Sequence, residues 1–341
     1  MEKDFLVTIC CLTFNHRAFI ANALDGFLAQ ETSFETEIIV YDDASTDGTT
    51  DILITYEKRF PQKIKLFLQN NNQYSKGENR IIGKFLLPHA RGKYIAICEG
   101  DDYWTDVQKL QKQVSALERN LDCSFSFHNA KIFSGKNEYS GRDLVLKSSK
   151  SGLCNADIIL GNFLPTASLI LRNFSFGEFP KWYYNGSAED FPLVLFLLTK
   201  GYGYYIDCFM SVYRHKVFGS CSEKLSNSSK EIKMEFYRNR IELLNEFNTA
   251  TAGCYAIPVN KMIIMYDFKI MLVTNGFLNR ISKFRNIQNN EYYHKMRDFF
   301  LFKCVIGLVS PHLYLSIINS RVLLRFIKSV RKFNNLSYGR K

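Results

Sequence analysis

Three acidic side chains follow a short apolar run in the first third of the chain. The run Tyr94–Ile97 leads through Cys98 into Glu99, Asp101 and Asp102. Such a run is typical of an interior strand of a parallel sheet, and ligands bind beyond the carboxyl ends of such strands. Carboxylate oxygens are ligands for a hard divalent ion such as Mg²⁺ or Mn²⁺, which would in turn hold phosphate oxygens. The pattern therefore predicts a cation site for a phosphorylated ligand.

The same residues have a structural interpretation. Asp101, Asp102 or Thr105 could cap the helix that the sequence predicts over about 106–120. This motif alone favours neither interpretation, so the rest of the chain has to decide between them.

Two more acid pairs stand next to predicted elements. Asp42 and Asp43 end the apolar run Glu37–Tyr41, and Glu189 and Asp190 precede an apolar helix over about 191–198. In a doubly wound sheet the pair at Asp42 would converge with the cluster near residue 100 at one crevice. The alternatives are again structural, because turn-forming and helix-capping residues follow Asp42 and because Asp190 could cap its helix.

The elements that must position these acids alternate between strand and helix up to residue 120. Apolar runs predict strands over 5–14, 37–41, 64–68 and 94–97, and helical spacing predicts helices near 19–28, 49–60 and 106–120. This alternation predicts an α/β fold with a mainly parallel sheet flanked by helices. Strands are expected over 123–133, 166–172 and 202–213, a helix over 188–200, and mainly helices from 222 onward.

No glycine-rich dinucleotide or P-loop motif follows the first strand. Several other motifs stand in order over about residues 5–222: Val7–Asn15, Glu37–Gly48, Gly77-x-Asn79, Ala90–Asp102, Lys109–Val114, Thr166–Arg172, Ala188–Asp190 and Ser211–Arg214. Together these motifs resemble glycosyltransferase family 2, whose members are nucleotide-sugar enzymes with the GT-A fold.

The resemblance implies roles at the donor end of the site. Thr13, Phe14 and Asn15 would border the donor base, and Asp43 would hydrogen-bond the edge of a pyrimidine, uracil being the usual base. Asp101 would lie near the ribose or the metal.

It also implies a metal and a general base. Asp102 would bind the Mn²⁺ or Mg²⁺ that bridges the diphosphate, and Asp190 matches the general base of an inverting transfer. Glu99 stands where many relatives have aspartate, and His215 is adjacent to the position, here Lys216, where relatives carry a histidine. Both are therefore candidate metal ligands only, and a histidine at a strand end is more often structural.

The basic charge of the chain is concentrated at its end. Residues 260–341 hold 15 Lys and Arg against 3 Asp and Glu, whereas residues 1–259 hold 29 against 30. Within 299–333, basic and apolar residues recur at helical spacing, which predicts either a helix on an anionic membrane surface or one packed on the catalytic domain. No nucleic-acid-binding module accompanies the charge. The nine scattered cysteines form no C-x-x-C pair, and the first residues lack the apolar core of a signal peptide, so a cytoplasmic protein, peripheral on the cell membrane at most, is expected.

The sequence thus predicts two regions, a GT-A catalytic domain over 1–222 and a helical, basic region over 223–341. The function expected from the resemblance is metal-dependent, inverting transfer from a nucleotide sugar, a UDP-sugar above all, to a polysaccharide or lipid-linked saccharide. Two alternatives stay open: a non-catalytic protein that binds sugar nucleotides or polyanions, and a sugar-phosphate nucleotidyltransferase. The second would need a glycine-rich phosphate loop after the first strand, and Leu12–His16 contains none.

Overall fold

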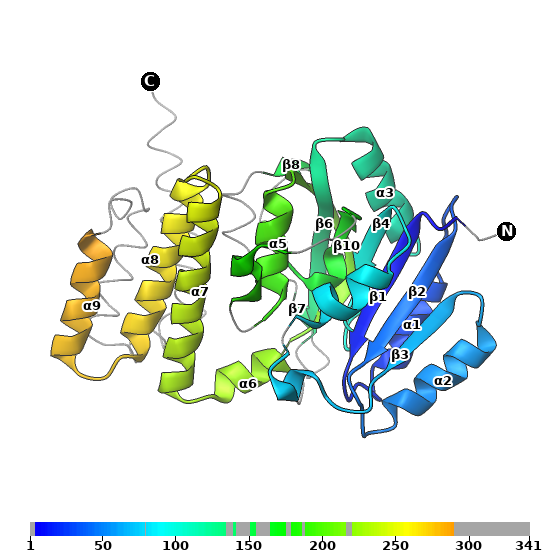
Figure 1. Ribbon diagram of the computed structural model, residues 1–341, viewed down its shortest axis with the longest axis horizontal. Coiled ribbons are helices and arrows are strands. Elements are labelled where there is room, and N and C mark those ends of the chain that lie inside the picture. The colour runs from blue at the N-terminus through cyan, green and yellow to red at the C-terminus, as the bar shows by residue number, and fades with distance from the viewer. Residues whose placement is uncertain are drawn as a thin grey trace. The chain divides into compact units, whose positions relative to one another are not determined.

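The computed structural model of the protein describes residues 4–78, 80–133, 139–140, 151–154, 164–174, 179–185, 188–215 and 220–289. Ten strands of these residues form one sheet, shown from blue to green in Figure 1. They are β1 (Val7–Thr13), β2 (Thr36–Asp42), β3 (Ile64–Leu68), β4 (Tyr94–Ile97), β5 (Tyr103–Trp104), β6 (Cys123–Phe133), β7 (Tyr139–Ser140), β8 (Gly152–Cys154), β9 (Ile170–Arg172) and β10 (Tyr202–Arg214).

The order of strands across the sheet is β3-β2-β1-β4-β9-β6-β10-β5, with β7 beside β6 and β8 beside β10. Strands β1 to β4 run parallel, β9 runs antiparallel to both β4 and β6, and β10 runs parallel to β6. The carboxyl ends of β1, β2, β4, β6 and β10 therefore lie along the same edge. Ligands of α/β proteins bind at such an edge, so the acids predicted from the sequence are brought to the expected side.

The described helices are α1 (Ile20–Leu28), α2 (Thr49–Arg59), α3 (Lys109–Arg119), α5 (Asp190–Leu198), α6 (Cys221–Asn227), α7 (Lys230–Ala250), α8 (Ala256–Val273) and α9 (Phe277–Asn289). A hydrophobic core lies between one face of the sheet and the helices α1 and α3. Alternate residues of β1 point to this face, because successive side chains of a strand point to opposite faces. Val7, Ile9 and Cys11 of β1 pack there with apolar residues of α1 and α3. The apolar face of each helix explains why these segments are helical.

The predicted α/β fold with a mainly parallel sheet is confirmed. One local prediction was wrong, and one alternative interpretation is excluded. Thr166–Ser168 forms a 3-10 turn and only Ile170–Arg172 is a strand. Asp101, Asp102 and Thr105 do not cap the helix that follows, because the short strand β5 intervenes and α3 begins only at Lys109. The capping interpretation of the acids near residue 100 is therefore excluded.

The chain divides into two compact units. The first comprises 1–227 and 245–258, and the second comprises 228–244 and 259–341. The described helices α6 to α9 agree with the helices expected after residue 222. Among the residues that the structure describes, no helix is long and apolar enough to cross a membrane. The segment 299–333, for which the sequence predicts either a helix on an anionic membrane surface or one packed on the catalytic domain, lies outside the described residues.

Lys109, the first residue of α3, is fully buried. Its Nζ atom lies 4.1 Å from the centre of the Trp104 ring and has no hydrogen-bond partner in the described part of the chain. Burial lowers the pKa of Lys109 from 10.5 to about 7, against the opposing effect of Cys98 and Asp106. The unfolded chain therefore binds more protons than the folded chain between these two pH values. Stability contributed by this lysine is lost as the pH falls toward 7.

We expect the free energy of unfolding to rise with pH from 7 to 10.5 by up to about 1.4 kcal/mol per pH unit from this group. Lys109→Met should remove that rise and make the protein more stable at pH 7. Denaturant unfolding at pH 7 and pH 9 measures both effects. Lys112→Met is the control in the same helix, since Lys112 Nζ is 2.6 Å from Asp106 Oδ2 and is partly exposed. An unchanged pH slope in Lys109→Met would contradict the prediction.

Candidate active site

The loop after β1 and the loop after β2 are joined by hydrogen bonds at the carboxyl edge of the sheet. Asn15 has a φ of 55°, a left-handed conformation that asparagine tolerates better than most residues. Its backbone N–H donates to Ser45 Oγ at 2.9 Å, and its Oδ1 accepts from the Thr46 N–H at 2.8 Å. Thr13 is buried at the end of β1, and the Phe14 side chain is exposed. The three residues predicted to border a base thus stand together at this edge.

Asp42 and Asp43 have different partners although they are adjacent. Asp42 accepts hydrogen bonds from Ser45 and from Thr50 Oγ1, so it fixes the turn and the start of α2 as the structural interpretation expected. Asp43 is buried, and its two carboxylate oxygens accept the N–H groups of Gln73 and Tyr74 at 2.7 and 3.1 Å. Asp43 therefore lies between the end of β2 and the chain that follows β3.

The acid loop after β4, Glu99–Asp102, is anchored to the end of β1. The N–H of Gly100 donates to the Leu12 carbonyl at 2.9 Å. A Cβ atom at Gly100 would lie 2.8 Å from Thr13 Oγ1 and 2.9 Å from Ile20 Cδ1, so this close approach requires glycine. The acids of the loop are thereby held beside the end of β1.

Burial and neighbouring negative charges raise the pKa values of Glu99 and Asp102 in this loop. Burial, followed by the charges of Asp101, Asp190 and Glu189, raises the pKa of Glu99 to about 8. Burial and then the charge of Asp101 raise the pKa of Asp102 well above its usual range. Asp190, which is distant in sequence, thus contributes to the same field of negative charge as the loop. Such a field favours binding of a cation.

The carboxyl end of β10 meets the acid loop. The N–H of Arg214 donates to Asp102 Oδ1 at 2.8 Å, and its guanidinium donates to the Asp101 carbonyl. The guanidinium also lies 4.6 Å from the Tyr103 ring centre. His215 directly follows Arg214, and its N–H donates to the Phe133 carbonyl at 2.8 Å. The structure therefore puts Asp102 and His215 at neighbouring strand ends.

Asp190 is the first residue of α5, and Glu189 is the residue before the helix. Glu189 makes no capping hydrogen bond to α5. Its buried carboxylate instead accepts the N–H groups of Ile82 and Gly83 and the hydroxyl of Tyr183. Residues Pro192–Leu198 of α5 are all buried, so the helix that carries Asp190 is fixed by its apolar sides.

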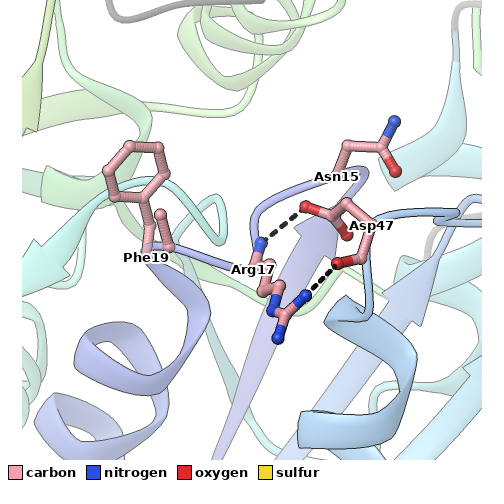
Figure 2. A pocket seen from close by; sticks show the side chains of 5 residues that line it. Asn15, Arg17, Phe19 and Asp47 are labelled. Atoms are coloured by element: carbon pink, nitrogen blue, oxygen red, sulfur yellow. Dashed lines mark hydrogen bonds between the residues drawn. The ribbon is translucent and has the colours of Figure 1, made fainter.

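An open pocket of about 490 Å³ lies beside the loop after β1. Asn15, Arg17, Ala18, Phe19 and Asp47 line it, and Figure 2 shows Phe19, the residue before α1, on one side and Asp47 on the other. Two hydrogen bonds from Arg17 to Asp47, one from its backbone N–H at 2.9 Å and one from its guanidinium at 3.3 Å, close the pocket wall.

Two residues at the site received no role from the sequence. His16 Nε2 is 4.0 Å from Asp101 Oδ2, and burial lowers the pKa of His16 below its usual value. Arg214 contacts both Asp101 and Asp102. Arg214 stands inside the motif Ser211–Arg214, which could have drawn attention to it. His16 gave no such signal, because its partner is distant in sequence. Of the aromatic residues that precede Glu189 in the chain, Trp182 and Tyr183 are buried, whereas Tyr184 is exposed.

The carboxylate oxygens of the acid loop suit a hard cation that takes its remaining ligands from a substrate and from water. No group of three or more His, Cys, Asp or Glu side chains that could hold a metal occurs in the described ranges. Asp101 Oδ1 is buried without a hydrogen-bond partner, and Asp102 is buried at the same loop. Mg²⁺ and similar ions are commonly held by one or two carboxylates together with substrate phosphates and water. The residues present fit a cation of this kind.

Residues 8–175 match the model of the family described as Glycosyl transferase family 2. The uncharacterised protein Rv1520 of Mycobacterium tuberculosis is 37% identical over 173 residues, which are 49% of this chain and 46% of that protein. The UDP-Glc:alpha-D-GlcNAc-diphosphoundecaprenol beta-1,3-glucosyltransferase WfaP of Escherichia coli is 29% identical over 208 residues, 58% of this chain and 71% of WfaP. The chain spans about half the length of the first of these relatives.

Solved structures share the fold at low identity. Residues 1–349 of S. aureus TarS in complex with UDP give a TM-score of 0.53 at 16% identity, covering 90% of this chain and 80% of that one. The mannosyltransferase PcManGT from Pyrobaculum calidifontis, in complex with GDP-Man and Mn²⁺, gives 0.50 at 14% identity, covering 98% and 84%. Residues 8–175 of this chain therefore form a domain that belongs to glycosyl transferase family 2, built on the GT-A fold.

Proposed function

We propose that this protein is an inverting glycosyltransferase that uses Mn²⁺ or Mg²⁺ and moves a sugar from a nucleotide sugar to a polysaccharide or lipid-linked saccharide. One observation carries the proposal. The acid loop Glu99–Asp102 stands at the carboxyl edge of the sheet, inside the segment that matches family 2, and the Arg214 N–H donates to Asp102. Burial first, and then the charges of Asp101 and Asp190, raises the pKa of Glu99, which supports placing the proposed general base near this loop. A domain boundary near residue 222 and a membrane-binding segment over 299–333 are part of the proposal.

The donor is proposed to be a UDP-sugar. WfaP is named for a UDP-glucose donor and a diphosphoundecaprenol-linked acceptor, and TarS was solved with UDP. PcManGT was solved with GDP-mannose, so the fold alone does not determine which nucleobase the donor carries. In this chain the buried Asp43 carboxylate, close to Thr13 and Asn15, would accept the N–H at the edge of a uracil ring.

Each proposed residue has one task in the reaction. Asp102 and His215 would hold the cation with the diphosphate oxygens, and Glu99 and Asp101 would supply negative charge around it. When bound, the cation offsets the charge that develops on the departing nucleoside diphosphate. Asp190 would take the proton of the acceptor hydroxyl as the new glycosidic bond forms on the opposite face of the sugar. Arg214 would keep Asp102 oriented through the hydrogen bond from its N–H.

A screen of UDP-, GDP- and dTDP-sugars with Mn²⁺ tests the proposal. We expect release of UDP from a UDP-sugar, faster with a diphosphate-linked lipid saccharide as acceptor and abolished by EDTA. The anomeric configuration of the product, read by NMR, tests inversion. Binding of UDP-sugars without turnover would favour the non-catalytic alternative. Formation of a nucleotide sugar from a sugar phosphate and a nucleoside triphosphate would favour the nucleotidyltransferase.

A further inference from the structure

Glu189 makes a buried connection between two segments that are distant in sequence. Its Oε2 accepts the N–H of Ile82 at 2.8 Å, and its Oε1 accepts the N–H of Gly83 and the hydroxyl of Tyr183, both at 2.6 Å. The side chain is 8% exposed. A carboxylate that is almost completely buried and holds three donors is a structural anchor, because little of it is left to receive a proton from a substrate.

Arg80 completes the connection in the reverse direction. Its Nε donates to the Tyr183 carbonyl at 2.7 Å and its Nη2 donates to the Asn185 carbonyl at 2.6 Å. Arg80 is 2% exposed, and its bond to the Tyr183 carbonyl is buried, whereas the bond to the Asn185 carbonyl is partly buried. Glu189 thus binds the segment of Arg80, and Arg80 binds the segment of Glu189. A reciprocal, buried pair of this kind fixes the distance between the two segments.

The backbone at Ile82–Leu86 is built around this contact. It forms a single π-helical turn. Such turns are rare in proteins, and those that occur are often at functional sites. A Cβ atom at Gly83 would lie 3.0 Å from Glu189 Oε1, 3.0 Å from the Tyr183 hydroxyl and 3.1 Å from Phe179 Cε2. Glycine at this position lets the carboxylate of Glu189 reach the backbone.

The segment that Glu189 holds continues from the chain bound to Asp43. Gln73 and Tyr74 give their N–H groups to Asp43, and Arg80 follows within a few residues. Asp43 is the acid proposed to bind the nucleobase of the donor. Glu189 directly precedes Asp190, the proposed general base, in the chain. The same stretch of chain therefore has one attachment at the donor end and one beside the proposed general base.

We propose that Glu189 is a positioning residue that sets the place of Asp190 relative to the donor by holding the π-helical turn at Ile82–Gly83. The inference rests on the proposed function, in which Asp190 takes the acceptor proton. Glu189 acts through Asp190 and touches neither donor nor acceptor. Loss of the anchor moves the base, and a displacement of about 1 Å in a reacting group can lower a rate on the order of 100-fold.

Glu189→Gln is the principal variant, because glutamine keeps the length of the side chain but has one acceptor oxygen for three donors. We expect faster hydrogen–deuterium exchange at Ile82 and Gly83 and a fall in kcat of roughly 10- to 100-fold, with the dissociation constant for UDP plus Mn²⁺ unchanged. Tyr183→Phe removes one of the three donors, so its effect on kcat should not add to that of Glu189→Gln. Exchange is measured by mass spectrometry and therefore does not depend on activity.

Glu37→Gln is the matched control. Glu37 is also buried and accepts hydrogen bonds, from Thr8 Oγ1 at 2.7 Å and from the Arg91 side chain at 3.0 Å, but it lies at the start of β2, at the opposite edge of the sheet. It should lower the melting temperature and leave kcat of the folded protein unchanged. A similar pattern in Glu189→Gln would reduce Glu189 to a stabilising role and overturn the proposal.

Other outcomes separate the remaining explanations. Lost transfer with normal exchange at Ile82 and Gly83 would make Glu189 the base, and weakened UDP-sugar binding would make it a donor ligand. Either result overturns the positioning role. If the wild-type protein transfers no sugar from any donor, the proposed function fails and the positioning role falls with it, even when exchange shows that the anchor exists. Normal transfer by Asp190→Asn with impaired transfer by Glu189→Gln would reject Asp190 as the group being positioned.

Discussion

Asp190→Asn is expected to lower the turnover of sugar transfer by about 100-fold or more while leaving donor binding intact. An inverting transfer needs a carboxylate on the acceptor side of the sugar, across from the metal and the diphosphate. Asparagine has nearly the same shape and can still interact with the start of α5, but it cannot take a proton. A 100-fold loss corresponds to about 2.7 kcal/mol of transition-state stabilisation. Initial rates at saturating donor give kcat, and calorimetry gives the dissociation constant for UDP with Mn²⁺.

Asp51→Asn is the control for the helix-start effect of this change. Asp51 is exposed and lies in the first turn of α2, and Asp190, which is half-buried, lies in the first turn of α5. Removing its charge changes the interaction with a helix N-terminus without touching the site, and transfer should stay normal. Near-normal transfer by Asp190→Asn would contradict the prediction and place the base elsewhere. Glu189 is then a weak candidate, because its carboxylate already binds three donors.

Asp102→Asn is expected to abolish the stabilisation of the protein by Mn²⁺ with UDP. A ligand present at 100 times its dissociation constant stabilises a folded protein by about 2.7 kcal/mol, and this increment should disappear. The asparagine Oδ1 can still accept the N–H of Arg214, which alanine would leave unpaired in the interior. Without ligand, the variant should be as stable as the wild type or more so. Burial raises the pKa of Asp102 well above its usual range, and the substitution removes that cost.

The measurement is the melting temperature with UDP alone, Mn²⁺ alone and both together. Asp122→Ala supplies a control with the same loss of charge, since Asp122 is exposed and precedes β6 at the amino edge of the sheet. It should retain the full shift with UDP and Mn²⁺. An unchanged shift in Asp102→Asn would show that Asp102 is not a metal ligand. EDTA should abolish the shift in the wild type and have no further effect on Asp102→Asn.

Local sequence patterns determined most of the domain that matches family 2. The apolar run Tyr94–Ile97 predicted a strand with the bounds that the structure has, because residues of interior strands are buried on both faces. The strand predicted over Cys123–Phe133 also has the same bounds in the structure. Helical spacing predicted α1 to within a residue. The strand–helix alternation then predicted the parallel sheet, and the acids that follow β2 and β4 were predicted to share its carboxyl edge. These features depend on neighbours in the sequence, which is why the sequence alone reveals them.

The roles of adjacent acids were decided only by the tertiary structure. Asp42 and Asp43 are chemically identical, but successive side chains point to opposite sides of a strand. Asp42 therefore fixes the start of α2, and Asp43 reaches the N–H groups of Gln73 and Tyr74. The adjacent acids Glu189 and Asp190 also have different partners. The carboxylate of Glu189 accepts hydrogen bonds from backbone N–H groups more than 100 residues away in the chain.

Contacts between residues distant in the sequence also brought Arg214 and His16, which had no role in the sequence analysis, to the site. Arg214 meets Asp102 because β10 returns along β6 to the carboxyl edge, although 112 residues separate the two in the chain. His16 meets Asp101 because the acid loop lies against the end of β1 at Gly100. No periodic pattern encodes such contacts, since they depend on how the sheet orders its strands. The sequence by itself determined which elements form and which acids end them, whereas packing of the sheet decided which of those acids face one another.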